Sequence, residues 1–113
     1  MADIQSPQLL VVVTSFAKLE DAKVMARKLL EAGLSACVQM TEGIHSLYRW
    51  EGKICEETET ILSAKTDVSR WEEISAFIKS HHPYELPELM GIAPAEYDQA
   101  YGQWVQAEVN SKS

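Results

Sequence analysis

The sequence predicts an α+β domain in which two helices cover one face of an antiparallel sheet. Short apolar runs rich in β-branched residues alternate with segments of helical periodicity, and a long central run contains neither proline nor glycine. No internal repeat or low-complexity linker divides the 113 residues, and a chain of this length suits one domain. We therefore expect residues 1–113 to form a single domain whose ordered core spans about 9–109.

The first half of the chain predicts strands around one amphipathic helix. Residues 9–13 form a continuous apolar run, as in a strand buried on both faces. The helix should end at Gly33, because the preceding apolar residues recur every three or four positions. These residues are Ala22, Met25, Ala26, Leu29 and Leu30. Residues 34–40 predict a second strand, and residues 41–43 predict a turn.

The middle of the chain predicts a long hairpin. Residues 44–50 and 53–65 are extended runs, and Glu51-Gly52 between them is typical of a tight turn. At about 3.3 Å per residue, the second run would extend roughly 40 Å, whereas a compact domain of this size has a radius of gyration of about 13 Å. The hairpin should overhang the domain, and a neighbouring subunit is the simplest cover for its aromatic tip. This predicts a closed oligomer.

The second half predicts two further helices and a short strand. Ser69 and Glu72 have the spacing of a capping box, which would start a helix bearing Trp71, Ile74, Phe77 and Ile78. Residues 87–93 predict the last strand. A final helix would carry Tyr97, Ala100, Tyr101, Trp104 and Val105. We interpret the order as βαββαβ plus a C-terminal helix, which is the ferredoxin-like order.

Composition excludes several classes of partner. Seventeen acidic residues against ten basic ones give a net charge of −7, which disfavours nucleic acid, since such binding rests on lysine and arginine. No apolar run approaches the roughly 20 residues that span a bilayer, and the first residues do not resemble a signal peptide. We expect a cytoplasmic protein without a membrane or nucleic-acid partner, in which Cys37 and Cys55 are reduced thiols.

The richest polar segment is His81-His82-Pro83-Tyr84. Proline biases the residue before it away from helix, so His82 should be extended, just past a helix end. Imidazole is a good ligand for copper(II), nickel and zinc. Adjacent side chains diverge, however, so a site at His81 and His82 would need Glu85, Glu88 or a neighbouring subunit. In the alternative interpretation, one histidine caps the helix and the other forms a hydrogen bond in an interface.

A second candidate group combines Lys65, Tyr84 and Glu88, with Trp50 as an aromatic wall. Each of the three polar residues ends a predicted element, where binding sites gather. They could form a polar pocket at a subunit boundary, or an intersubunit set of salt bridges and hydrogen bonds. Tyr48 and Trp104 could add to the wall, although aromatic residues are more often core or interface.

Other reactive-looking residues have simpler interpretations. We expect Cys37 to be a small buried side chain, and Cys55 to be a poor nucleophile because neighbouring carboxylates disfavour the thiolate. Glu57 and Glu59 should share one face of a solvated strand. The sequence lacks the phosphate-binding GxxxxGK[ST], the GxSxG and the HExxH motifs, and we expect no enzymatic activity.

Several motifs in order resemble the CutA-type divalent-cation tolerance proteins. They are SLYRWEGK at 46–53, Lys65-Thr66, KSHHPY at 79–84 and PEL at 87–89, with LSAC at 34–37. The resemblance covers about residues 9–109. It implies a ferredoxin-like fold, a tight homotrimer similar in architecture to the PII signalling proteins, and a cytoplasmic role in divalent-metal tolerance.

The resemblance also implies copper binding, and His81 and His82 match the histidine pair proposed as its ligands. Some members add a cysteine at the end of the first strand, where this chain has Ser15. A hydroxyl is a poor substitute for a thiolate toward copper. Two hypotheses follow: a homotrimer that binds copper or another divalent ion at the histidines, or a PII-like regulatory or scaffold trimer that binds a metabolite or partner protein in the intersubunit cleft.

Overall fold

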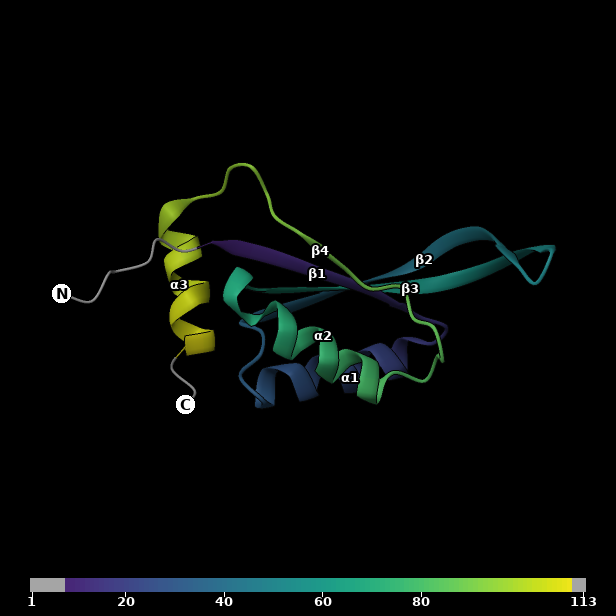
Figure 1. The fold of residues 1–113 in the computed structure, drawn as a ribbon, viewed down its shortest axis with the longest axis horizontal. Coiled ribbons are helices and arrows are strands. Elements are labelled where there is room, and N and C mark those ends of the chain that lie inside the picture. The colour runs from purple at the N-terminus through teal and green to yellow at the C-terminus, as the bar shows by residue number, and fades with distance from the viewer. Residues whose placement is uncertain (1–7, 111–113) are drawn as a thin grey trace.

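The computed structural model describes residues 8–110, so both ends of the domain expected over 1–113 lie outside the described residues. The elements, in order, are β1 (Leu9–Phe16), α1 (Leu19–Glu31), β2 (Cys37–Trp50), β3 (Lys53–Asp67), a short 3-10 helix (Val68–Arg70), α2 (Trp71–His81), β4 (Met90–Ile92) and α3 (Gln99–Asn110). The strands form one sheet in the order β2-β3-β1-β4, and every neighbouring pair is antiparallel (Figure 1). The α+β class and the ferredoxin-like order are therefore confirmed.

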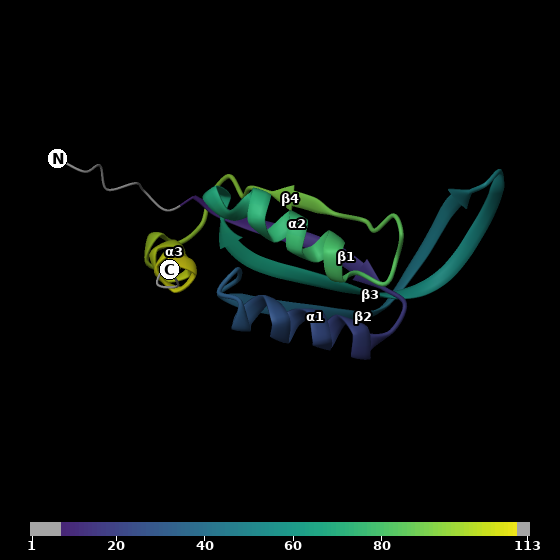
Figure 2. The same cartoon turned by 60° about the horizontal axis from the view of Figure 1, so that its bottom comes forward.

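Helices α1 and α2 lie on the same face of the sheet and bury the core beneath them (Figure 2). Val12 and Phe16 of β1, Leu29 of α1, Leu62 of β3 and Ile74 of α2 are all fully buried in this cluster. Alternate residues of β1 and one stripe of each helix supply these side chains, as strand and helix periodicity require. Among the described residues, no helix is long and apolar enough to cross a membrane.

The turn predicted at residues 41–43 is wrong, because β2 runs through it as one strand. Thr41 pairs with Ile61 and Ile44 pairs with Glu59, so two residues of β2 lie opposite a single residue of β3. This is a β-bulge, and Gly43 adopts a φ of 76° within it. A bulge increases the local twist. It also joins the two predicted segments into one strand, which brings the sheet to four strands.

The β2–β3 hairpin overhangs the domain, as predicted (Figure 1). The last residue of β1, Phe16, pairs with Thr60, so residues 53–59 of β3 pair with β2 alone. The molecule measures 56 × 27 × 22 Å. Leu47 and Ile54 near the tip are 65% and 73% exposed, which leaves an apolar surface far from the core.

Asp67, rather than the predicted pair Ser69 and Glu72, caps the start of the second helical segment. The Ser69 amide and hydroxyl both donate to Oδ2 of Asp67, at 3.0 and 2.6 Å. Ser69 therefore donates instead of accepting, and the expected capping box is wrong. Burial alone would raise the pKa of Asp67, but the hydrogen bonds from Ser69, Gln8 and Gln106 hold that pKa below its ordinary value.

The sheet face opposite α1 and α2, called here the open face, carries an apolar strip. Val11 lies beside Ile92 and Val13 beside Met90; directly opposed residues in antiparallel strands share a face. Ile61 of β3 continues the strip. The side chains of Met90 and Ile92 are 45% and 49% exposed.

The last strand, β4, is shorter than the predicted 87–93, because only Met90–Ile92 pairs with β1.

Candidate functional site

The loop after α2 places the two histidines on different parts of the molecule. Helix α2 ends at His81, and His82 is extended, with φ −81° and ψ 140°, as the proline that follows it predicts. The ring of His81 stacks on Phe77 of the same helix, with centroids 4.2 Å apart. The ring of His82 stacks on Phe16 of β1 at 4.3 Å. The two histidine side chains therefore diverge, as predicted.

His82 uses both of its ring nitrogens within the fold. Nδ1 accepts a hydrogen bond from the backbone N–H of Tyr84 at 3.0 Å, and Nε2 lies 2.9 Å from the carbonyl oxygen of Ser15. A carbonyl only accepts, so Nε2 must carry the proton and the ring is the neutral Nε2–H tautomer. Burial lowers the pKa of His82, against smaller opposing effects of the Ser15 carbonyl and Asp21. A metal could bind this ring only by breaking one of these contacts.

His81 is arranged differently and leaves one nitrogen for a ligand. Its Nδ1 lies 2.9 Å from the carbonyl oxygen of Phe77, so this nitrogen carries the proton and donates to the last turn of α2. The alternative interpretation, in which one histidine caps the helix, describes His81 well. Nε2 of this exposed ring then carries the lone pair. Metal-bound histidines commonly donate their other N–H to a carbonyl in this way.

Within one chain, the histidines do not gather further metal ligands. Among residues 8–110, no group of three or more His, Cys, Asp or Glu side chains is placed to hold a metal ion. Glu85 and Glu88, the expected helpers, line a cleft that neither histidine lines. Zinc would require four ligands, or three and water. A tight metal site at His81 and His82 would therefore need residues of another subunit.

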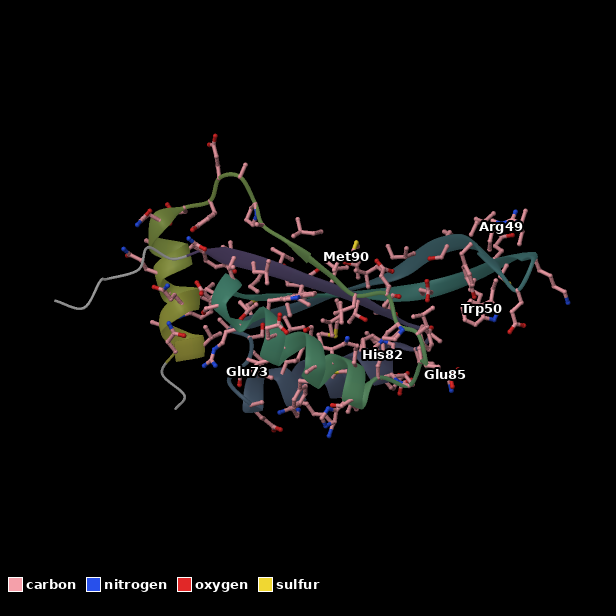
Figure 3. All side chains as sticks on the ribbon, in the orientation of Figure 1. Arg49, Trp50, Glu73, His82, Glu85 and Met90 are labelled. Carbon is pink, nitrogen blue, oxygen red and sulfur yellow. The ribbon has the colours of Figure 1, made fainter. Side chains whose placement is uncertain are left out.

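The loop after α2 and the overhanging hairpin border a cleft of about 800 Å³, called here the hairpin cleft. Trp50, Tyr84 and Glu88 line it together, so the structure brings together three of the four residues predicted to share a pocket. Figure 3 shows Trp50 on the hairpin and Glu85 on the loop, the two segments that border the cleft. Tyr48, Glu57 and Glu59 also line the cleft.

Two tyrosines orient two carboxylates in the hairpin cleft. The hydroxyl of Tyr84 donates to Oε2 of Glu59 at 3.2 Å, and the hydroxyl of Tyr48 donates to Oε1 of Glu57 at 2.6 Å. Burial, with the charge of Glu59, raises the pKa of Tyr84 to about 12. The hydrogen bond to Glu57 raises the pKa of Tyr48 to about 12 as well. Both phenols therefore stay neutral at physiological pH and remain donors.

Lys65 lies apart from this group within one chain. It is six residues from Glu59 along β3, or roughly 20 Å at the usual rise per residue. Its ammonium group donates to Oε1 of Gln39 at 2.6 Å. Lys65 could reach a hairpin cleft only on a neighbouring subunit, and its place in the predicted group depends on the oligomer.

The sequence analysis missed Glu57 and Glu59 as site residues. Their shared face was predicted correctly, but they were interpreted as a solvated strand surface. The available signal was that their alternation places them on the same sheet face as Tyr48 and Trp50 of the other hairpin strand. Trp104 does not line the cleft; it is 45% exposed on α3 and lies 5.9 Å from the ring of Tyr101. Cys37 and Cys55 are both free and half-buried.

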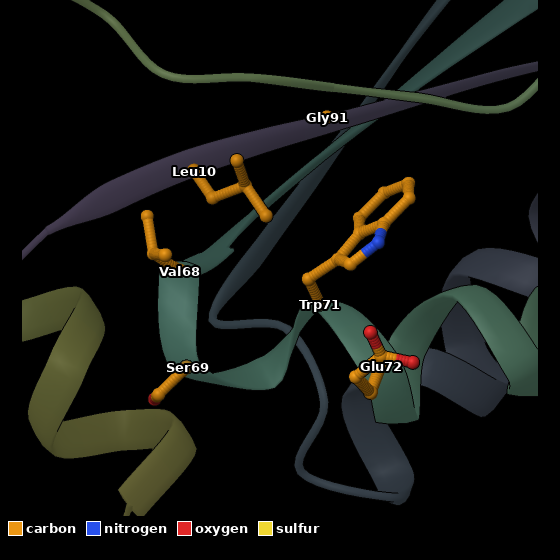
Figure 4. A pocket seen from close by; sticks show the side chains of 6 residues that line it. All are labelled: Leu10, Val68, Ser69, Trp71, Glu72 and Gly91. Atoms are coloured by element: carbon orange, nitrogen blue, oxygen red, sulfur yellow. The ribbon is translucent and has the colours of Figure 1, made fainter.

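A second, smaller pocket of about 400 Å³ lies between β4 and the start of α2 (Figure 4). Its walls are mainly apolar and include Leu10, Trp71 and Gly91. A Cβ atom on Gly91 would lie 3.1 Å from the Trp71 ring. Only one carboxylate, that of Glu72, borders this pocket, so it offers no group of converging polar side chains.

The structure is an α+β fold with a ferredoxin-like sheet, an overhanging hairpin and a histidine-containing loop beside that hairpin. Residues 10–108 match the CutA1 divalent ion tolerance protein family, and the chain belongs to that family. It is not a known enzyme family, in agreement with the lack of catalytic motifs.

Named relatives support this assignment over nearly the whole chain. The divalent-cation tolerance protein CutA of Citrobacter koseri is 36% identical over 107 residues, covering 95% of this chain and 93% of the relative. CutA of Synechococcus elongatus has a TM-score of 0.86 at 36% identity, with 94% of each chain covered. A structure described as periplasmic divalent cation tolerance protein CutA, from Archaeoglobus fulgidus, has a TM-score of 0.85 at 30% identity, covering 89% and 98%.

The Synechococcus elongatus protein has also been solved in complex with a Bis-Tris molecule. That structure has a TM-score of 0.82 at 35% identity, covering 93% of this chain and 97% of the relative.

Proposed function

We propose that this protein acts as a homotrimer in the response to divalent cations, and that the hairpin cleft is its ligand-binding site. The observation that carries the proposal is the cleft itself, in which two neutral phenols orient two carboxylates beside Trp50. A concave site with a few oriented polar groups and an aromatic wall is typical of small-ligand binding. The Synechococcus elongatus relative has been solved with a small molecule, Bis-Tris, which is compatible with a small-ligand site in this chain.

Two surfaces support the trimer. The open face presents Val11, Val13 and Ile61, together with the half-exposed side chains of β4, and the hairpin tip presents Leu47 and Ile54. Apolar surfaces of this kind mark subunit contacts. A ring of three copies would cover both surfaces on every subunit.

The two free cysteines support the cytoplasm as the compartment of this protein, since free thiols persist where disulfides are reduced.

For copper and other divalent ions we propose weak binding through His81, without a part for His82. His81 offers one lone pair on an exposed ring, whereas both nitrogens of His82 are engaged. Ser15 directs its backbone carbonyl oxygen to His82 and offers only a hydroxyl as a side-chain ligand. One imidazole per chain gives a low-affinity site.

Calorimetric copper(II) titration separates the two histidines. We expect wild-type protein to bind copper no more tightly than the micromolar range, the His81→Ala variant to lose that binding, and the His82→Ala variant to keep it. Oligomeric state should be checked for each variant by light scattering. Submicromolar, saturable binding that requires both histidines would instead make the pair the metal site.

The cleft is tested separately, by thermal unfolding with a panel of metabolites, since a ligand that prefers the native state raises the melting temperature. We expect a stabilising ligand to lose its effect in Trp50→Ala. Trp104→Ala is the matched control, because Trp104 is similarly exposed but lies outside the cleft. Equal ligand effects in both variants, or stabilisation by metal ions alone, would contradict the cleft as the functional site.

A further inference from the structure

Carboxylates predominate among the ionisable side chains that line the hairpin cleft, and the others are His45, Tyr48 and Tyr84. Four glutamates line it, and no lysine or arginine does. The carboxylates come from both walls: Glu57 and Glu59 from the hairpin, Glu85 and Glu88 from the loop. Such a cleft concentrates negative potential between low-dielectric walls. It should repel phosphates, nucleotides and carboxylic acids, and attract cations.

The acidic groups are mixed with three aromatic rings, those of Tyr48, Trp50 and Tyr84. Aromatic faces attract organic cations through their quadrupoles, and tryptophan does so best. A hydrated divalent ion requires several oxygen ligands at 2.0–2.6 Å around one point. The described residues contain no such group of three acidic or histidine side chains. Carboxylates spread over a long cleft therefore suit an extended organic ion better than a metal ion.

The tyrosine hydrogen bonds also prepare the carboxylates for a donor. Tyr84 occupies Oε2 of Glu59 and Tyr48 occupies Oε1 of Glu57, so the second oxygen of each carboxylate remains to accept from a ligand. The tyrosine hydroxyls hold both groups in place before a ligand arrives, which reduces the entropy lost on binding. Charge-assisted hydrogen bonds to such oxygens are stronger than neutral ones.

We infer that the hairpin cleft binds a small organic cation carrying ammonium or guanidinium groups. This inference rests on the proposed function, in that the cleft must be the ligand site. Ammonium and guanidinium donors would be held by Glu57 and Glu59, and the connecting aliphatic chain would lie along Trp50.

The test is a calorimetric titration of the full-length native oligomer with agmatine, a dication with one ammonium and one guanidinium group. The matched ligand is 4-guanidinobutanoate, which keeps the guanidinium group but carries a carboxylate at the other end. We expect agmatine to bind about tenfold or more tightly than 4-guanidinobutanoate, because each 1.4 kcal/mol of lost charge pairing is a factor of ten.

The matched variants remove equal charge inside and outside the cleft. Glu57→Gln/Glu59→Gln keeps the shape and the tyrosine acceptors, and we expect it to weaken agmatine binding at least about tenfold. Glu56→Gln/Glu96→Gln removes the same charge at residues that do not line the cleft and should change the affinity less than about twofold. Circular dichroism and light scattering confirm that each variant keeps its fold and oligomeric state.

A further variant tests the aromatic part. Trp50→Leu keeps every charge in the cleft, so its expected loss of agmatine affinity reports the contribution of the indole ring, through packing on the aliphatic chain and cation–π attraction together. Equal binding of agmatine and 4-guanidinobutanoate, or equal effects of the two double variants, would overturn the inference. Displacement of agmatine by magnesium at equal concentration would overturn it too, because the cleft would then attract any cation.

Failure of this inference is distinguishable from failure of the proposed function. A neutral or anionic metabolite whose stabilising effect is lost in Trp50→Ala would keep the cleft as the ligand site and exclude the organic cation. No cleft-dependent ligand of any charge would contradict both.

Discussion

The imidazole of His82 lies nearly parallel to the ring of Phe16, with centroids 4.3 Å apart and planes inclined by 10°. Phe16 is fully buried at the end of β1, so His82 anchors the loop after α2 directly to the core. Tyr84, two residues further on, donates its backbone N–H to the same imidazole. Its hydroxyl donates a hydrogen bond to Glu59. His82 therefore positions one wall of the hairpin cleft.

Replacing His82 should destabilise the protein more than replacing His81. His82→Ala removes a stacked ring and two hydrogen bonds, and we expect the free energy of unfolding to fall by about 1–3 kcal/mol. His81→Ala removes an exposed ring and should lower it by less than about 1 kcal/mol. Urea unfolding at one fixed protein concentration measures both, since an oligomer's stability depends on concentration. Equal losses would contradict the anchoring role.

Stability should depend on pH through His82. In the folded state, burial lowers the pKa of His82 below its ordinary value of 6.5. The unfolded chain therefore binds a proton at His82 more readily than the folded protein does. The contribution of His82 is then complete above pH 6.5 and is lost as the pH falls from 6.5 through the lower folded-state pKa. Asp21 opposes this shift, and the nearby phenol of Tyr84, whose pKa is raised to about 12, stays neutral in this range.

Urea unfolding between pH 7.5 and 5 measures this dependence. We expect His82→Gln to flatten the fall in unfolding free energy over the window, whereas His81→Gln should leave it in place. An unchanged slope in His82→Gln would show that other groups carry the pH dependence.

A charge on the open face should break the proposed trimer. Val13 is half-buried there beside Met90, and in a trimer Val13→Glu would bury an unpaired carboxylate, which is strongly unfavourable. We expect light scattering to report monomers of Val13→Glu. Val24→Glu is the control, because Val24 is 55% exposed on α1, and this variant should keep the wild-type mass. A full-size oligomer of Val13→Glu would place the interface elsewhere.

Gly91→Ala should destabilise β4. A Cβ atom at this position would meet two ring carbons of Trp71 at 3.1 Å and Cδ1 of Leu10 at 3.3 Å. Overpacking of this kind costs about 1–3 kcal/mol, and the melting temperature should fall accordingly. Gly91→Ala should lower the melting temperature less in a Trp71→Leu background than in the wild-type protein, because the smaller side chain leaves room for the alanine methyl. No such coupling between the two sites would show that the ring moves aside freely.

Local signals predicted most of the fold because they depend on neighbouring residues. Helical periodicity located α1 and α2, and Glu51-Gly52 predicted the hairpin turn, where φ is 50° and 79°. Gly43 misled the prediction, because a positive φ serves a turn and a bulge equally well. Only the partner strand, which continues past this point, distinguishes the two.

The candidate site was predicted only in part, for a similar reason. Pro83 predicted the extended backbone of His82, but the ring's stacking partner, Phe16, is 66 residues away in the chain. Tyr84 and Trp50 were predicted to share a pocket and do so, whereas Lys65 was included with them and lies elsewhere on β3. Position at the end of an element is visible in a sequence, but the distance between two such ends is not.

The sequence by itself determined the order of the elements, the overhang of the hairpin, the extended backbone at His82 and membership of the CutA1 divalent ion tolerance family. These follow from periodicity, strand length and proline stereochemistry, which act over a few residues, and from ordered motifs. Only the tertiary structure decided which histidine nitrogen is left for a metal and which carboxylates meet the aromatic rings. Those outcomes depend on contacts between strands and loops distant in the chain, and such contacts form only when the core brings them together.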